Sequence, residues 1–197
     1  CAVLLPYSCG IAGHRAKAVC ERPSRPDAGD KSVEFRFGDQ TIRVTHRDGP
    51  ALLARRFQPD IVQLPVNMLD QRAHRTGVLS ELAALGVDIH ASSVFADGLL
   101  FVSGEALPPD MARHSHALSR IRRRLAEARV DPMQATLAYA LGMEEVSAVV
   151  ASVASAAELR ATIAAAHAPA PALDWEALQL EPATIATGSA ARISSAA

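Results

Sequence analysis

The stretch Asp60-Ile61-Val62-Gln63-Leu64-Pro65 is a short apolar run that a proline closes, which is the pattern of a buried β-strand. Two further apolar runs of similar length follow it, at residues 87–91 and 146–151. Segments with helical periodicity separate the three runs. Short apolar strands that alternate with helices predict parallel strands joined by right-handed crossovers. The chain is therefore predicted to have an α/β fold of layer or barrel type.

Helix signals surround these strands. Asp131 followed by Pro132 is a strong helix start, because aspartate caps the first free N–H groups and proline fits the first turn. Gly86 is placed to end a helix whose apolar face includes Leu79 and Leu82. The predicted helices cover residues 50–57, 79–85, 110–130, 131–141 and 155–167, with a last short helix from Trp175.

The part of the chain before residue 49 has a different texture. Residues 1–31 are rich in proline and glycine without a sustained period, which predicts irregular structure. Apolar and polar residues then alternate on either side of Gly38-Asp39-Gln40, which is typical of a β-hairpin. We therefore expect an irregular and hairpin segment (1–48), a regular α/β part (49–181) and a flexible tail (182–197).

The composition excludes several classes of protein. The 197 residues include 20 Lys and Arg and 21 Asp and Glu, so the chain lacks the basic surplus that nucleic-acid binding requires. No apolar run approaches the roughly 20 residues that cross a bilayer, so no membrane segment is predicted. The three cysteines and seven histidines lack metal-ligand spacing, so we expect no metal site and a reducing, cytoplasmic setting.

Three segments in series resemble one known family. Residues 60–72 resemble the sixth strand and following loop of the aldo-keto reductases, residues 90–100 the seventh, and residues 149–159 the eighth. The resemblance implies strands 6–8 and their helices from the C-terminal half of a (β/α)8 TIM barrel, whose full length is roughly 250 residues. It also suggests a degraded fifth strand over residues 41–49, with Thr45 on the cofactor side.

The resemblance implies an NADP-dependent oxidoreductase that reduces a small-molecule carbonyl substrate with NADPH. Gln63 matches the family glutamine that binds the nicotinamide carboxamide, although capping of strand-end backbone groups is an equal alternative. Ser93, Phe95 and Gly98 match the loop around the pyrophosphate, where small residues let backbone N–H groups approach phosphate. A simple core position is the alternative for Phe95.

Three more residues match the adenosine end of the cofactor site. Ser152 stands where the family has glycine, so its side chain is expected to obstruct the approach of phosphate. Ser155 matches a serine that donates to the 2′-phosphate at a helix start, although an ordinary N-cap is an equal alternative. Arg160 either pairs with that phosphate or belongs to a solvated helix face.

The family's catalytic residues find no match. Carbonyl reduction in the family uses a tyrosine as general acid with a lysine, an aspartate and often a histidine, all in the first half of the barrel. The only tyrosines and lysines of the chain are Tyr7, Tyr139, Lys17 and Lys31, and Tyr139 lies mid-helix, where packing is its expected role. We therefore assign no catalytic residue and expect a truncated, catalytically impaired chain, since losing the proton donor alone costs on the order of 10²–10⁴ in rate.

Two other interpretations stay open. The chain begins with Cys1, which suggests a fragment or gene remnant in which residues 1–48 are foreign to the family. Alternatively, a half barrel exposes strand edges, and these predict a non-enzymatic interaction module that self-associates through edge pairing.

Overall fold

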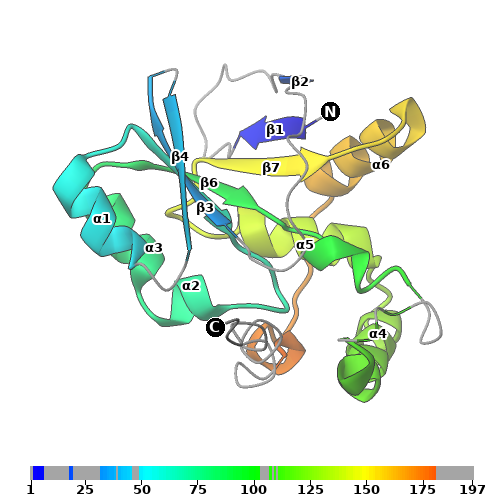
Figure 1. Ribbon diagram of the computed structural model, residues 1–197. Coiled ribbons are helices and arrows are strands. Elements are labelled where there is room, and N and C mark those ends of the chain that lie inside the picture. The colour runs from blue at the N-terminus through cyan, green and yellow to red at the C-terminus, as the bar shows by residue number, and fades with distance from the viewer. Residues whose placement is uncertain are drawn as a thin grey trace, which may run out of the picture.

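The chain folds around a mixed β-sheet, as seen in the computed structural model (Figure 1). The structure describes residues 2–6, 18–19, 32–38, 40–45, 49–102, 107, 109 and 111–180. Within these residues the strands follow the order β2-β1-β7-β6-β5-β3-β4 across the sheet. Their bounds are β1 (Ala2–Pro6), β2 (Ala18–Val19), β3 (Ser32–Phe37), β4 (Gln40–Thr45), β5 (Ile61–Pro65), β6 (Asp88–Ser92) and β7 (Ala148–Ser152).

The three predicted strands form the centre of this sheet. β5 pairs with β6, and β6 pairs with β7, in both cases in parallel. Each strand lies within two residues of its predicted position, because a short apolar run between turn residues is a local signal. The α/β class is therefore confirmed, and the parallel core agrees with part of a reductase barrel.

The helices also lie close to their predicted positions. Asp131 caps α5, since its Oδ1 accepts hydrogen bonds from the N–H groups of Met133 at 2.8 Å and Gln134 at 3.3 Å. The predicted helix over 110–130 is shorter, because a separate 3₁₀ turn at Ala112–His114 precedes α4. The helices are α1 (Pro50–Phe57), α2 (Arg72–Arg75), α3 (Val78–Ala84), α4 (Ser115–Glu127), α5 (Pro132–Leu141) and α6 (Ala156–His167), with 3₁₀ turns η2 (Ala96–Gly98), η4 (Ala112–His114) and η5 (Glu176–Leu178).

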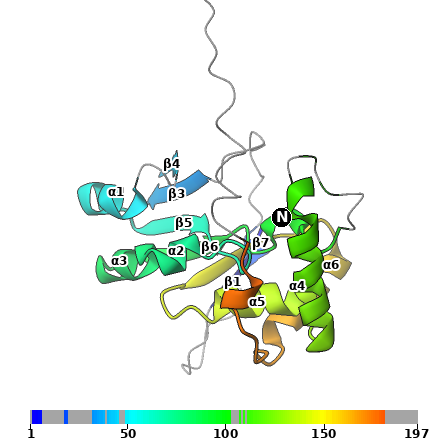
Figure 2. The ribbon, with the colours of Figure 1, turned by 90° about the horizontal axis from the view of Figure 1, so that it is seen from below.

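The two faces of the parallel core differ in burial. The side chains of Val62, Leu64, Ile89, Ala91 and Val149 are fully buried on the face that packs against helices. Helix α3 packs on β6 and α5 packs on β7, and Figure 2 shows α1 and α3 on one side of the molecule and α4 and α6 on the other. No helix in the described part of the chain is both long and apolar enough to cross a membrane.

The opposite face of the core is more accessible. Alternate residues of the same strands point there, and they are half-buried at Gln63, His90 and Val150 and exposed at Ser152. In a complete barrel this side of the strands faces the interior. The predicted site residues on β5 and β7 therefore lie on the face that the helices leave open.

The expectation of irregular structure over residues 1–31 is wrong at β1 and β2. Strand β1 runs antiparallel to β7, with Leu4 opposite Val150. The free edge of β7 has backbone groups that need partners, and the short apolar run at the start of the chain supplies them. A four-residue apolar run without a clear period does not reveal such pairing by itself.

The hairpin prediction is confirmed, but the fifth-strand interpretation is wrong. Strands β3 and β4 pair antiparallel around Gly38. It is β3, and not β4, that lies beside β5, and β3 runs antiparallel to it, with Glu34 opposite Gln63. A barrel strand at that place would run parallel to β5. Thr45 lies in β4, one strand away from the core.

Both edges of the parallel core are consequently covered. Strand β1 pairs with the outer edge of β7, and β3 pairs with the outer edge of β5. The predicted self-association through open edges of a half barrel therefore has no free strand edge available at β5 or β7. The expected flexible tail, residues 182–197, lies outside the described residues.

Candidate functional site

The carboxyl ends of β5, β6 and β7 lie at one edge of the sheet. The register places Gln63 beside His90 and Pro65 beside Ser92. On the other side of β6, His90 lies beside Ala148. Because all three strands are parallel, the segments that follow them start from the same edge, and this edge is where α/β proteins place their functional groups.

Gln63 occupies the middle of a polar row on the open face. Its neighbours across the sheet are Glu34 on β3 and His90 on β6. Burial lowers the pKa of His90; the Asp88 carboxylate opposes this shift, and the Arg36 guanidinium adds to it. A half-buried amide beside an imidazole is equipped to donate and accept hydrogen bonds, as a carboxamide ligand requires.

The loop after β6 has an unusual backbone. Ser93, Ala96 and Asp97 have φ values of 51°, 47° and 55°, in the left-handed region that side chains rarely adopt, and Gly98 has 79°. Two tight turns hold this shape, since the N–H of Ala96 donates to the carbonyl of Ser93 at 2.9 Å and that of Gly98 donates to the carbonyl of Phe95, also at 2.9 Å. Strained backbone of this kind is typical of ligand-holding segments.

Phe95 and Arg122 hold the loop in place. The ring of Phe95 is half-buried and packs edge-on against Phe101, with centroids 6.0 Å apart. Arg122 of α4 donates to the carbonyls of Leu99 at 2.7 Å, Leu100 at 3.1 Å and Val102 at 2.6 Å. Phe95 is therefore a packing residue in the structure, whereas Arg122 is a brace that the sequence did not single out.

The segment after β7 forms a helix cap. The Ser155 hydroxyl accepts a hydrogen bond from the N–H of Glu158 at 3.1 Å, and the Glu158 carboxylate accepts one from the N–H of Ala154 at 2.7 Å. Arg160 is exposed and its guanidinium reaches back to the carbonyl of Ala156 at 3.4 Å. Ser152 is exposed at the end of β7. The structure thus shows the N-cap role for Ser155 and the solvated position for Arg160.

A comparison with known protein families identifies the family to which the chain belongs. The sequence model described as "Aldo/keto reductase family" matches residues 46–179. The chain belongs to the aldo/keto reductase family. A comparison with curated proteins gives no match. The matched range contains the whole parallel core and leaves out β1 to β4, the strands that flank this core antiparallel.

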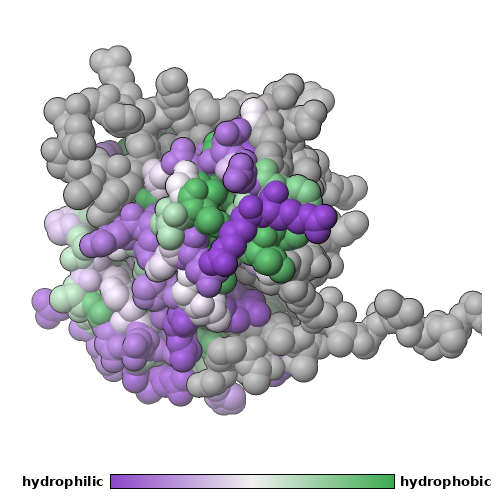
Figure 3. All heavy atoms as spheres, turned by 90° about the vertical axis from the view of Figure 1, so that its left-hand side faces the viewer, coloured by the Kyte–Doolittle hydropathy of each residue, from purple (hydrophilic) through white to green (hydrophobic). Residues whose placement is uncertain are grey.

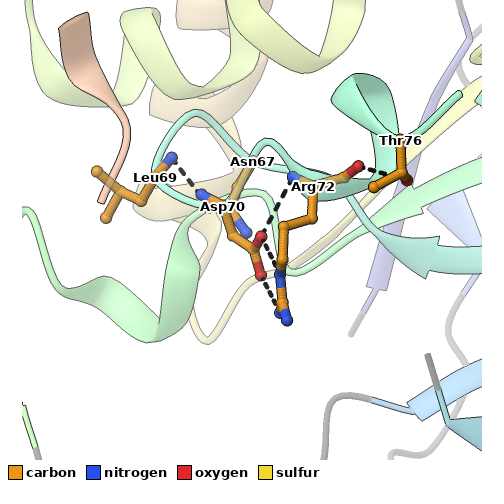
Figure 4. A network of polar contacts seen from close by, with 5 residues as sticks. All are labelled: Asn67, Leu69, Asp70, Arg72 and Thr76. Carbon is orange, nitrogen blue, oxygen red and sulfur yellow. Dashed lines mark hydrogen bonds and ion pairs between the residues drawn. The ribbon is translucent and has the colours of Figure 1, made fainter. Parts of the chain in front are cut away.

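A polar network after β5 stiffens the site of this reductase-family chain (Figure 4). The Asn67 carboxamide oxygen accepts from the N–H groups of Leu69 at 3.1 Å and Asp70 at 2.9 Å. Asp70 forms a two-point ion pair with Arg72, at 2.8 Å from Nε and 2.7 Å from Nη2, and this hydrogen bonding raises the pKa of Arg72. The Thr76 hydroxyl donates to the carbonyl of Arg72 at 2.7 Å. The sequence prediction missed this network, although asparagine and aspartate right after a strand are a turn signal.

Tyr139 lies on the helix side of the sheet, near the segment that follows β5. It is buried in α5, and its ring packs edge-on against Trp175 with centroids 5.5 Å apart. Burial, with a smaller contribution from the Asp70 carboxylate, raises the pKa of Tyr139 to about 12. A tyrosine on the helix side of the sheet agrees with the predicted packing role. Tyr7, Lys17 and Lys31 lie outside the described residues.

Two surface hollows lie elsewhere in this reductase-family chain. One, of about 570 Å³, is near the amino ends of β5 and β6 and is lined by residues that include Asp60, Leu85 and Asp88. Figure 3 shows mixed hydrophobic and hydrophilic side chains on the side of the molecule that carries α1, where Leu52 and Phe57 are exposed. The other hollow, of about 560 Å³, lies between α2, α5 and Trp175. In the described residues, no three His, Cys, Asp or Glu side chains are grouped for a metal ion.

Proposed function

We propose that this chain is the dinucleotide-holding part of an aldo/keto reductase and does not reduce carbonyl substrates by itself. The parallel order of β5, β6 and β7 is the observation that carries this proposal, because it places Gln63 on the open face of β5 and starts the Ser93–Gly98 loop at the carboxyl end of the neighbouring strand β6. Residues 49–181 would form this part, with residues 1–48 adding the strands that cover its edges. A bound dihydronicotinamide would supply hydride in the family's reaction.

The residues fit the cofactor unevenly. Gln63 has an amide on the open face that could bind the nicotinamide carboxamide, and the left-handed loop offers backbone N–H groups at the place where the pyrophosphate would lie. The start of α6 does not fit a 2′-phosphate, because its capping groups are already paired. These observations therefore support the binding of a nicotinamide dinucleotide in general. They do not support the NADPH preference that the family resemblance implies.

The proposed lack of activity follows from the position of the tyrosines. A carbonyl reductase needs a proton donor beside the carbonyl oxygen while hydride arrives at carbon. Tyr139 is buried among helices on the far side of the sheet, so its hydroxyl cannot serve the open face. The proposal therefore separates dinucleotide binding from carbonyl reduction, which requires a proton donor that the described residues do not place at the open face.

Calorimetric titration of the full chain with NADH and with NADPH tests the proposal. We expect binding of at least one dinucleotide at micromolar concentration. Gln63→Leu should weaken it about tenfold, because the amide hydrogen bonds are lost. The matched control is Gln134→Leu on α5, where the amide donates to the carbonyl of Pro169. Absence of binding of both dinucleotides up to millimolar concentration would contradict the proposal.

Activity is measured separately, with 4-nitrobenzaldehyde and either reduced dinucleotide, by absorbance at 340 nm. We expect no turnover above the uncatalysed rate. Turnover that persists after repeated purification and in the Tyr7→Phe, Tyr139→Phe double variant would overturn the proposed inactivity, because a different proton donor would then serve the site.

A further inference from the structure

We infer that the hollow between α2, α5 and Trp175 binds a small zwitterion that carries an apolar ring, as an aromatic α-amino acid does. Its volume of about 560 Å³ lies within the range of roughly 300–1,000 Å³ that is usual for small-molecule sites. The hollow is on the helix side of the sheet, so it is separate from the open face and from the proposed dinucleotide site. Three features carry the inference: walls that are held in place, an aromatic floor, and opposite charges on opposite walls.

The hollow is formed in advance by contacts between two distant parts of the chain. One wall is α2 with the residue before it, and the other is the C-terminal segment over residues 173–176, which runs into η5 (orange in Figure 1). The Gln71 side-chain amide donates to the carbonyl of Trp175, and Nη1 of Arg75 donates to Oε1 of Gln179 at 2.8 Å. A ligand that enters a hollow with fixed walls loses little binding energy to the ordering of those walls.

The floor of the hollow is apolar and aromatic. The ring of Tyr139 packs edge-on against that of Trp175, with centroids 5.5 Å apart, and the half-buried side chains of Met143 and Leu173 extend this surface. Aromatic rings and a methionine thioether are favourable neighbours for a further ring. Tyr139 is 2% exposed, and in the described part of the chain its hydroxyl has no hydrogen-bond partner. The floor therefore suits a ring and adjoins an unused polar group.

The rim of the hollow carries opposite charges on its two walls. His74 and Arg75 are exposed on α2, whereas Asp174 and Glu176 are exposed on the C-terminal segment. Among the described residues, no ion pair joins these two walls. A ligand with a single charge would be attracted by one wall and repelled by the other, whereas a zwitterion is attracted by both. We therefore place the ligand carboxylate toward Arg75 and its ammonium toward Glu176, near rings that also attract cations.

The fluorescence of Trp175 tests the inference, because it is the only tryptophan of the chain and it lines the hollow. We expect L-phenylalanine to change this fluorescence in the full chain with a dissociation constant of about 1 mM, as suits a ligand of its size. 3-Phenylpropionate lacks the ammonium and 2-phenylethylamine lacks the carboxylate, so each should bind about fivefold more weakly. Calorimetry measures the same constants without an optical signal. Equal binding of all three compounds, or no binding of L-phenylalanine at about 20 mM by either method, overturns the inference.

Two variants test the two walls separately. Arg75→Gln should weaken the binding of L-phenylalanine about fivefold and leave that of 2-phenylethylamine no weaker, because only the cation that faces a carboxylate is lost. Glu176→Gln should weaken L-phenylalanine by a similar factor and leave 3-phenylpropionate no weaker. Arg120→Gln is the control, since Arg120 is exposed on α4 outside the lining of the hollow, and it should change none of the three constants.

The pattern across the ligands separates a charge effect from a loss of structure. A distorted hollow would bind all three compounds more weakly, whereas removal of one charge affects only the ligands that carry its partner. Equal weakening of all three ligands by either variant, or unchanged binding of L-phenylalanine in both, overturns the inference. Neither readout involves a dinucleotide, so the proposed function stands or fails independently.

Discussion

Tyr139 and Asn67 show how the structure leaves polar atoms buried near the site. The Tyr139 hydroxyl and the Asn67 side-chain nitrogen are both buried without a hydrogen-bond partner in the described part of the chain. An unpaired buried polar group destabilises the folded state, because water satisfied it in the unfolded chain. Burial of Tyr139 therefore stabilises the fold through the packing of its ring and destabilises it through its unpaired hydroxyl.

Tyr139→Phe is expected to stabilise the chain by about 1 kcal/mol in urea unfolding at pH 7, because it removes the unpaired hydroxyl and keeps the ring against Trp175. The same variant should also change how the free energy of unfolding depends on pH in the alkaline range. The pKa of Tyr139 is raised to about 12 in the folded state, whereas an unfolded tyrosine ionises near 10, so folded stability falls as pH rises between these values. The free energy of unfolding of the Tyr139→Phe variant should not fall in this way between these pH values. A variant that is less stable than the wild type at pH 7 would show that the hydroxyl has a partner after all.

At the scale of single elements, Arg122 connects α4 to the loop after β6. Its guanidinium donates to three loop carbonyls at 2.6–3.1 Å, and charge-assisted hydrogen bonds of this kind are stronger than neutral ones. Four residues of this loop, Ser93, Ala96, Asp97 and Gly98, have positive φ. The local sequence alone does not favour this conformation for the three residues that are not glycine. The brace from α4 is therefore a main reason why the loop keeps its shape.

Arg122→Met should destabilise the chain by about 2 kcal/mol, because three carbonyls lose a charged donor while the aliphatic packing is kept. Hydrogen exchange of a peptide covering residues 93–102 should accelerate more than exchange elsewhere. Arg123→Met is the control, since Arg123 is exposed on the same helix and has no described loop contact. Equal acceleration in both variants would show that the loop does not depend on the Arg122 contacts.

The elements divide clearly into those that the sequence predicts and those that it does not. The parallel strands and α5 have local signals, namely an apolar run closed by Pro65 or an aspartate cap at Asp131, and the structure confirms them. The strand state of Ala2–Pro6 depends on pairing with β7, about 145 residues later in the chain, which no local pattern encodes. The sequence leaves two roles open for Ser155, because the spacing of Ser155 and Glu158 indicates a helix cap while the family resemblance implies a phosphate contact at the same serine; the structure shows the cap.

At the scale of the whole molecule, two flanking strands change what a half barrel can do. Strands β5, β6 and β7 would present two free edges in isolation, and free edges pair with other chains. Strands β1 and β3 cover those edges, so the sheet is extended by antiparallel strands where a closed barrel would have parallel ones. The chain thereby gains an open mixed sheet whose polar face stays accessible.

This arrangement predicts that breaking β1 releases the edge of β7. Consecutive residues of a strand direct their N–H groups to opposite sides. Among the described residues, β2 pairs with Ala2 and Val3 alone, so of Leu4 and Leu5 one N–H faces β7 and the other faces a side where no described strand pairs with it. Of the two variants Leu4→Pro and Leu5→Pro, one should therefore lose a ladder hydrogen bond and at least about 1 kcal/mol of stability. That variant should also self-associate in light scattering, while its neighbour stays closer to the wild type. If both variants remain as stable and as dispersed as the wild type, β1 does not protect the edge of β7, and the coverage of the core would have to come from another part of the chain.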